Sequence, residues 1–236
     1  MPEVNEELIE IEDLRFGWPS AAPLLSCDHF LLRRGQHLYI RGPSGSGKST
    51  LLNLLAGVLT PDSGRLSLMQ QDTGSLAAAA RDRLRADHIG FIFQQFNLVP
   101  YLNLAENVIL PCHFSRRRAT HAVEAHGGVT AAARLLLQRL FVEEELDPTA
   151  PVSRLSVGQQ QRVAAARALI GDPEIVIADE PTSALDFDAR ARFIELLFEQ
   201  VQASRATLVF VSHDPTLAAC FDRTVDIDDF RSETRP

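Results

Sequence analysis

Lysine is almost absent from this sequence: its 236 residues include 23 basic residues, and only Lys48 among them is a lysine. Acidic residues outnumber basic ones, and the net charge is −8. This balance argues against a general nucleic-acid binder, because such proteins present basic surfaces to phosphates. Cysteine is also scarce: Cys27, Cys112 and Cys220 lie far apart and form no C-x-x-C pair. We expect three small, buried apolar side chains in a reducing compartment.

Two further absences concern export and membranes. The acidic N-terminus lacks a positive region followed by an apolar one, so it does not predict a signal peptide. No uncharged apolar run approaches the roughly 18 residues that cross a bilayer. Hydrophobic residues make up 45% of the chain, which is enough for a sizeable core. We therefore expect a soluble protein that reaches a membrane only through a partner.

The single lysine completes a glycine-rich motif that matches G-x-x-x-x-G-K-[ST]. The motif consists of Gly42, Pro43, Ser44, Gly45, Ser46, Gly47, Lys48, Ser49 and Thr50. A predicted strand at 36–41 precedes it and a predicted helix at 49–56 follows, and in this context backbone N–H groups cradle phosphates. A compact ammonium suits β- and γ-phosphates better than a planar guanidinium. The motif predicts a nucleoside triphosphate as ligand, with Mg²⁺ on Ser49.

Residues 175–180 predict a buried strand that ends in two carboxylates. Asp179 offers the oxygen ligand that Mg²⁺ prefers. Glu180, one residue further, is offset towards the γ-phosphate and can polarise an attacking water.

Residues 155–162 predict the start of another helix. Ser156 and Gln159 have the spacing of a capping box. The same helix N-terminus, with Gly158 allowing close approach, can bind a γ-phosphate. Capping and phosphate binding are compatible, so both interpretations stand.

Strands and helices alternate along most of the chain. Strands are predicted at 8–16, 65–68, 89–93, 175–178, 207–211 and 224–227, and residues 30–39 are interpreted as a second hairpin pair broken at 34–35. Helices are predicted at 77–84, 130–141 and 189–202. Between about 95 and 170 the pattern is helical, with a polar loop over 113–130. This order predicts an α/β protein with a parallel sheet and an all-helical insertion.

With these motifs in this order, the chain resembles the ATP-binding subunit of an ABC transporter over roughly residues 8–228. Residues 42–49 match Walker A and residues 155–159 match the signature. Asp179 matches the Walker B aspartate and Glu180 the catalytic glutamate.

Three shorter motifs complete the resemblance. Gln94 matches the Q-loop, residues 183–186, which end in Asp186, match the D-loop, and His213 matches the switch histidine. The resemblance implies a P-loop NTPase core with a parallel sheet, an antiparallel β subdomain and an all-helical insertion. It implies one domain over 1–236, with the core at about 8–94 and 171–228 and the helical subdomain at about 95–170.

The resemblance also implies the chemistry and the partners. ATP and Mg²⁺ are the expected cofactors, with catalytic roles for Lys48, Glu180 and His213, and with Gln94 joining Ser49 and Asp179 around the metal. A homodimer is expected, in which one copy's signature acts in trans on the ATP of the other. The signature residues are Ser156, Val157, Gly158 and Gln159. An integral-membrane permease is the expected partner, without nucleic acid, which implies a cytoplasmic protein on the inner face of the cell membrane.

Two positions depart from the family pattern. Val157 stands where the family's LSGGQ has its first glycine, and valine adds bulk and restricts the backbone. The family also stacks adenine on a tyrosine near the first strand, but the tyrosines here are Tyr39 and Tyr101. Phe16 occupies the expected place, and Trp18 is a second choice.

Three segments have sequences similar to those of the lipoprotein-releasing and macrolide-exporter group of ABC ATPases, namely residues 90–94, 97–100 and 106–108. The permeases of that group have few membrane spans. Amino-acid importers and the cell-division ABC ATPase have much of the same sequence in these segments, so both stay open as alternatives. A repair ATPase is disfavoured, because no sustained heptads lie between Lys48 and Asp179. A regulatory module without turnover is a third possibility that depends on Val157 alone.

Two surface features have two interpretations each. The apolar residues Phe96, Leu98, Val99 and Tyr101 form either a groove for a permease helix or internal packing. The run at 116–118, three arginines, either faces anionic lipid or lies in a solvated loop.

Overall fold

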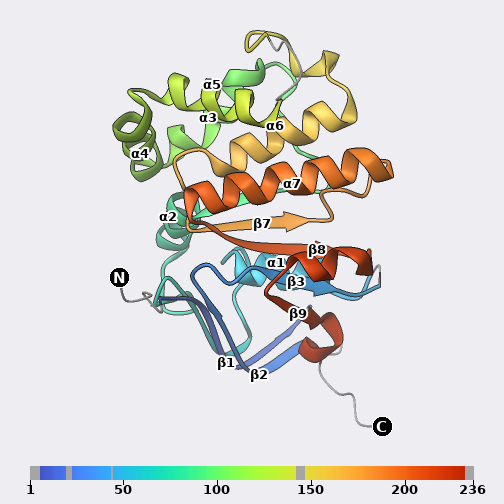
Figure 1. Ribbon diagram of the computed structural model, residues 1–236. Coiled ribbons are helices and arrows are strands. Elements are labelled where there is room, and N and C mark those ends of the chain that lie inside the picture. The colour runs from blue at the N-terminus through green and yellow to red at the C-terminus, as the bar shows by residue number, and fades with distance from the viewer. Residues whose placement is uncertain (1–5, 20–22, 44, 142–146, 232–236) are drawn as a thin grey trace. The chain divides into compact units, whose positions relative to one another are not determined.

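The computed structural model describes residues 6–19, 23–43, 45–141 and 147–231. The chain divides into two compact units, one formed by residues 1–85 and 207–236 and the other by residues 86–206 (Figure 1). Among the described helices, none combines the length and the apolar character needed to cross a membrane.

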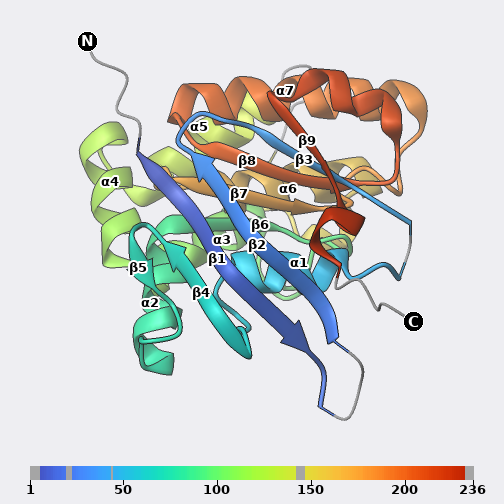
Figure 2. The same ribbon diagram turned by 90° about the horizontal axis from the view of Figure 1, so that it is seen from below.

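An antiparallel sheet occupies part of the first unit (Figure 2). β1 (Glu7–Gly17) lies between β2 (Pro23–Arg33) and β4 (Ser63–Leu68), and β5 (Gln71–Asp72) pairs with the far side of β4. The predicted alternation in β1 is confirmed over most of its length: Ile11, Leu14 and Phe16 are buried, whereas Glu12 and Asp13 are exposed. This period of two follows from the pleat of a strand with one buried face.

A parallel arrangement forms the other part of the first unit. β3 (Leu38–Arg41) lies between β8 (Thr207–Ser212) and β9 (Arg223–Asp226) and runs parallel to both. Six residues separate the end of β3 from the start of α1 (Lys48–Leu55). Short 3₁₀ turns follow β8 (Pro215–Cys220) and β9 (Ile227–Phe230).

The interpretation of residues 30–39 as a hairpin pair is wrong. β2 pairs with β1 in the antiparallel sheet, whereas β3 pairs with β8 and β9. The turn at Arg34 and Gly35, where Gly35 has φ 78°, therefore carries the chain from one sheet to another. Two strands that follow each other closely look like a hairpin in the sequence, but their partners come from distant segments.

The second unit combines two parallel strands with helices (Figure 1). β6 (Ile89–Ile92) pairs with β7 (Ile175–Asp179), and α2 (Ala78–His88) leads directly into β6. The helices are α3 (Leu104–Phe114), α4 (Arg116–His126), α5 (Val129–Leu140), α6 (Val157–Leu169) and α7 (Phe187–Ser204), with a 3₁₀ turn at Val152–Arg154. α6 packs against α3, α5 and β6, and eight of its residues are buried. The predicted helical subdomain at about 95–170 stays a prediction, since the compact unit also includes β6, β7 and α7.

The expected polar loop over 113–130 is wrong. Ser115 caps a helix by accepting a hydrogen bond from the N–H of Arg118, and α4 follows. Arg118 is only 2% exposed, and its guanidinium donates to the carbonyl oxygens of Ala168 at 2.6 Å and Ile170 at 2.7 Å. The interpretation of the three arginines as a solvated loop is therefore wrong, and Arg118, a buried partner of the C-terminal end of α6, cannot face lipid.

The cysteines only partly follow the prediction. Cys27 is buried, Cys112 is half-buried and Cys220 is exposed. Burial raises the pKa of the Cys27 thiol to about 11, so this side chain stays protonated and unreactive at neutral pH.

Candidate functional site

The glycine-rich loop forms a phosphate cradle in the first unit. Gly45 and Gly47 have φ values of 75° and 100°, in the left-handed region that favours glycine. Gly47 is the N-cap of α1 and makes no side-chain capping hydrogen bond, and a helix N-terminus of this kind favours an anion. Gly42 must also be a glycine, because a Cβ there would lie 2.3 Å from Cγ2 of Ile227. Ser44 lies outside the described residues.

Two polar side chains face this cradle. Lys48 is 6% exposed, and its Nζ donates to the carbonyl oxygens of Gly42 at 2.9 Å and Pro43 at 2.7 Å. Ser46 is 2% exposed, and its hydroxyl has no hydrogen-bond partner among the described residues. A buried hydroxyl without a partner is costly. A helix N-terminus without a cap, a buried ammonium and an unpaired hydroxyl fit the phosphates of a nucleotide.

Strand pairing brings His213 to the same edge as the cradle. β3 and β8 are parallel, and Arg41 pairs with Ser212. Gly42 and His213 each follow directly, at the carboxyl ends where ligands bind in parallel sheets. The hydroxyl of buried Tyr39 donates to the carbonyl oxygen of Asp214 at 2.6 Å and holds the backbone beyond His213.

The second unit brings three more predicted residues to one edge. β6 and β7 are parallel, with Ile92 paired to Ala178. Asp179 ends β7, Glu180 follows it, and Gln94 lies two residues beyond the end of β6. Glu180 has φ 42°, a left-handed conformation that is uncommon and costly for a residue with a side chain. Strain of this kind is typical of functional sites.

The predicted capping box at the start of α6 is confirmed. The Ser156 hydroxyl accepts from the N–H of Gln159 at 3.2 Å, and the Gln159 side chain accepts from the N–H of Ser156 at 2.9 Å. Val157 is the first residue of α6 and is not among the residues with positive φ, so the helix begins without strain at this valine. The restricted backbone of valine is therefore no obstacle to this helix start. The added bulk of its side chain at the signature is still a difference from glycine.

The D-loop lies beside this helix start. A Cβ on Gly158 would lie 3.7 Å from Cδ2 of Leu185. Asp186 is the N-cap of α7, and its carboxylate accepts from the N–H of Ala189 at 2.8 Å. The signature and the D-loop therefore form one contiguous part of the second unit.

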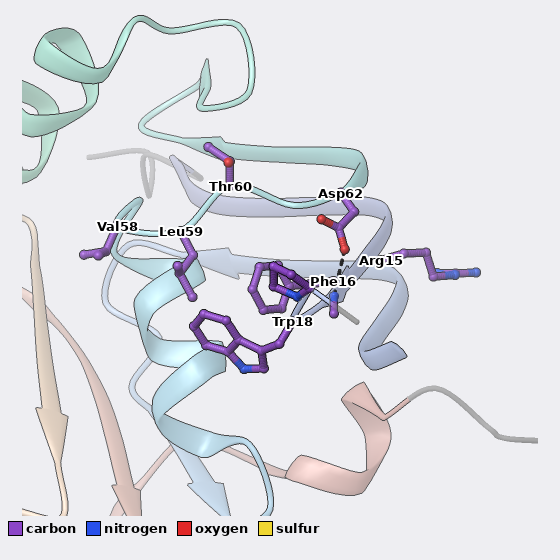
Figure 3. A pocket seen from close by; sticks show the side chains of 9 residues that line it. Arg15, Phe16, Trp18, Val58, Leu59, Thr60 and Asp62 are labelled. Atoms are coloured by element: carbon purple, nitrogen blue, oxygen red, sulfur yellow. Dashed lines mark hydrogen bonds between the residues drawn. The ribbon is translucent and has the colours of Figure 1, made fainter. Parts of the chain in front are cut away.

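A pocket of about 520 Å³ in the first unit is lined by both aromatic candidates (Figure 3). Its walls are Arg15, Phe16, Gly17, Trp18, Pro19, Val58, Leu59, Thr60 and Asp62. Phe16 is 6% exposed and Trp18 is 48% exposed, and the rings meet edge to face at a centroid distance of 5.4 Å. Asp62 accepts from the N–H of Gly17 at 2.8 Å and fixes the turn between the two rings. Of the two side chains, Trp18 is therefore the more accessible to a ligand.

This aromatic pair lies close to the phosphate cradle. A Cβ on Gly47 would lie 3.6 Å from side-chain atoms of Leu24 and Leu25, and Leu25 pairs with Phe16 across β1 and β2. The sequence does not predict that Val58, Leu59, Thr60 and Asp62 line a pocket. These residues show no local pattern that distinguishes them from an ordinary turn.

A phosphate cradle after a parallel strand of the first unit, together with two carboxylates at a strand end of the second unit, is typical of a P-loop nucleotide hydrolase. The family model described as "ABC transporter" matches residues 25–183. The chain therefore belongs to the ABC transporter family, as an ATP-binding subunit with ATPase activity.

Three known proteins illustrate the similarity. The lipoprotein-releasing system ATP-binding protein LolD of Hydrogenovibrio crunogenus is 42% identical over 201 residues, which cover 85% of this chain and 84% of LolD. The macrolide export ATP-binding/permease protein MacB 2 of Aeromonas hydrophila is 37% identical over 231 residues, which cover 97% of this chain and 34% of MacB 2. The dimeric post-hydrolysis structure of the ATP-binding cassette MJ0796 of Methanocaldococcus jannaschii, bound to ADP and Pi, is 34% identical. The superposition covers 94% of this chain and 95% of the MJ0796 chain, with a TM-score of 0.80. This similarity confirms the predicted fold class.

Proposed function

We propose that this ATPase works as a homodimer around two Mg-ATP and powers the permease of an exporter or of another system that acts mechanically on the cell envelope. One observation carries the proposal. The chain aligns over 97% of its length with only 34% of MacB 2, a protein named for both an ATP-binding part and a permease. The similarity to LolD supports the same transport group. An importer ATPase or a non-transport ABC ATPase remains the alternative.

Three residues with side-chain oxygens are proposed as ligands of Mg²⁺. We assign Ser49 at the start of α1, Asp179 at the end of β7 and Gln94 after β6 to the metal, because Mg²⁺ prefers oxygen ligands. When bound, the ion neutralises charge on the β- and γ-phosphates. Lys48 binds the same phosphates, Glu180 orients and polarises the attacking water, and His213 contacts the γ-phosphate. Further ATP contacts are assigned to the rest of the loop at 42–50.

The homodimer supplies the remaining groups. Ser156, Val157, Gly158 and Gln159 of one copy act on the ATP of the other, with the N-terminus of α6 directed at the γ-phosphate. Asp186 is assigned to the same surface, since its neighbour Leu185 lies where a Cβ on Gly158 would be within 3.7 Å of it. The dimeric state of the MJ0796 cassette supports this assembly.

Adenine is proposed to stack on Trp18, the second of the two aromatic choices, in place of the buried Phe16. Trp18→Ala is expected to weaken ATP binding about tenfold, within the range measured for base stacking on aromatic side chains. Trp18 is the single tryptophan of the chain, so ATP titration should also quench the intrinsic fluorescence of the wild type. Trp18→Phe retains a ring and should retain most of the affinity.

Phe16→Leu is the matched control for Trp18→Ala. Because Phe16 is buried, its loss should lower the free energy of unfolding while ATP affinity stays close to wild type. Equal ATP affinity in Trp18→Ala and wild type, or a large loss in Phe16→Leu alone, would contradict the assignment.

The segment after the Q-loop provides a test of the permease partner. Phe96 is 8% exposed and belongs to internal packing, whereas Tyr101 is 86% exposed. We propose that Tyr101 contacts the permease. Tyr101→Asp should reduce co-purification with a permease encoded beside this protein and should leave basal ATPase activity unchanged, because a charge in an apolar contact is unfavourable.

Tyr101→Phe, which preserves the ring, should co-purify like wild type. Full co-purification of Tyr101→Asp would remove this residue from the contact. Failure of the wild type to bind any neighbouring permease would instead favour the non-transport alternative.

A further inference from the structure

Arg167 is a buried arginine in α6 that reaches the loop after β6. It is 8% exposed, and its two terminal nitrogens donate to the carbonyl oxygens of Phe96 at 2.5 Å and Asn97 at 2.7 Å. A planar guanidinium can donate hydrogen bonds to two neighbouring acceptors in a fixed geometry. The ammonium of a lysine is a point charge on a flexible stem and fixes two acceptors less well. Burial of the guanidinium lowers the pKa of Arg167, but arginine keeps its charge in proteins.

The two acceptors lie in an unusual stretch of backbone. Phe96 has φ 59° and Asn97 has φ 49°, so two consecutive residues with side chains adopt the left-handed conformation. Such conformations are uncommon and persist when surrounding contacts impose them. Tight hydrogen bonds close the same turn, from the N–H of Phe96 to the carbonyl oxygen of Phe93 and from the N–H of Asn97 to that of Gln95. Arg167 accounts for the orientation of the two carbonyl groups.

The position of this turn connects two proposed functional elements. Gln94 lies two residues before Phe96, inside the stretch that the hydrogen bonds close. Arg167 belongs to the helix whose N-terminus carries Ser156 and Gly158. A direct side-chain contact therefore joins the signature helix to the backbone that holds Gln94.

We propose that Arg167 is a positioning residue for ATP hydrolysis, which fixes the backbone after Gln94 and ties the Q-loop to the signature helix. This rests on the proposed role of Gln94 as a ligand of Mg²⁺. Arg167 itself touches neither metal nor nucleotide in this account. Its effect passes through the carbonyl groups of Phe96 and Asn97 to Gln94.

A double-mutant cycle tests the proposal. Arg167→Met should lower kcat by about 10- to 100-fold, since a displacement of about 1 Å in the active site can cost about 100-fold. KM for ATP should change much less, because the phosphate loop is intact. In a Gln94→Ala background the same substitution should change kcat little, since the residue it positions is gone. The Mg²⁺ concentration for half-maximal activity should rise in Arg167→Met and in Gln94→Ala alike.

Arg118→Met is the matched control. Arg118 is also buried, and its two short hydrogen bonds go to the carbonyl oxygens of Ala168 and Ile170 at the end of α6. Longer ones, at 3.4 Å, reach the carbonyl oxygens of Ile89 and Arg167, but none reaches Phe96 or Asn97. Its loss should lower the free energy of unfolding without raising the Mg²⁺ requirement, and its effect should add to that of Gln94→Ala. Arg167→Lys, which keeps the charge but cannot hold both acceptors equally, should fall between wild type and Arg167→Met and provides a second variant if the methionine variant does not fold.

The outcomes separate two failures. Independent, additive effects of Arg167→Met and Gln94→Ala on kcat would overturn the positioning role, as would an unchanged Mg²⁺ requirement in both Arg167 variants. If Gln94→Ala itself leaves kcat and the Mg²⁺ requirement unchanged, the proposed role of Gln94 fails, and the link to catalysis fails with it. Hydrogen exchange over residues 93–100 then reports separately whether Arg167 holds this backbone, with faster exchange expected in Arg167→Met.

Discussion

Replacing Glu180 with glutamine is expected to slow ATP hydrolysis by about 10²- to 10⁴-fold, the usual loss when a general base or a water-orienting group is removed. Glu180 directly follows β7 and is held in a left-handed conformation, which turns the chain sharply at the carboxylate. Glutamine has nearly the same shape but cannot accept a proton from water. ATP binding should persist, because the phosphate cradle at 42–50 is unchanged. Steady-state turnover and equilibrium nucleotide binding measure the two effects.

The same variant tests the dimer. We propose that hydrolysis separates the two subunits, so Glu180→Gln should accumulate as an ATP-bound dimer in size-exclusion chromatography with light scattering. Glu195→Gln makes the same chemical change on an exposed part of α7 and should behave like wild type. A purely monomeric Glu180→Gln protein at saturating ATP would contradict the proposed dimer, and turnover close to wild type would remove Glu180 from catalysis.

Replacing Lys48 with alanine is expected to abolish ATP turnover and to weaken ATP binding strongly. The ammonium donates to the carbonyl oxygens of Gly42 and Pro43, within the loop that we propose binds the phosphates. The circular dichroism spectrum should match that of the wild type, because Lys48 contacts the loop and its loss leaves the apolar core intact. Lys48→Arg keeps the charge but should also be inactive, since a planar guanidinium does not fit a site built for a compact ammonium. Full activity in either variant would exclude Lys48 from phosphate binding.

A mixture of two inactive proteins tests the trans arrangement of the signature. Lys48→Ala lacks a working phosphate loop, and Ser156→Arg lacks the cap of α6 and blocks the signature. Their heterodimer combines the phosphate loop of the Ser156→Arg copy with the signature of the Lys48→Ala copy, which leaves one intact composite site. Activity above that of either variant alone is expected over a range of ratios. Crosslinking cysteines placed at Ser44 and Ser156 should then join two chains, and a crosslink within one chain would overturn the arrangement.

Local features of the fold were predictable where a short stretch of sequence contains all the information needed. The alternation in β1 and the capping box of Ser156 and Gln159 depend on neighbours two or three residues away. Strand ends could also be placed, because apolar runs stop at the polar residues that do the chemistry. β7 ends at Asp179, and the ends of β6 and β8 lie within two residues of Gln94 and His213.

Features that depend on distant segments were not predictable in this way. α4 was expected as a loop, because arginines and histidines hide its helical pattern, and the burial of Arg118 depends on carbonyl groups 50 and 52 residues away. β3 was assigned to a hairpin with its predecessor, although its partners are β8 and β9. A single sequence records a strand's pattern but not which other strand satisfies its hydrogen bonds.

The sequence by itself determined the chemistry of this protein: one lysine in a glycine-rich loop, two carboxylates after an apolar strand and a capped helix start can be identified by spacing alone. Tertiary structure decided which side chains are available for that chemistry. It buried Phe16 and left Trp18 open, and it brought Arg167 to carbonyl groups 70 and 71 residues away. The physical reason is that exposure and hydrogen-bond partners are properties of packed surfaces, which segments remote in the chain create together.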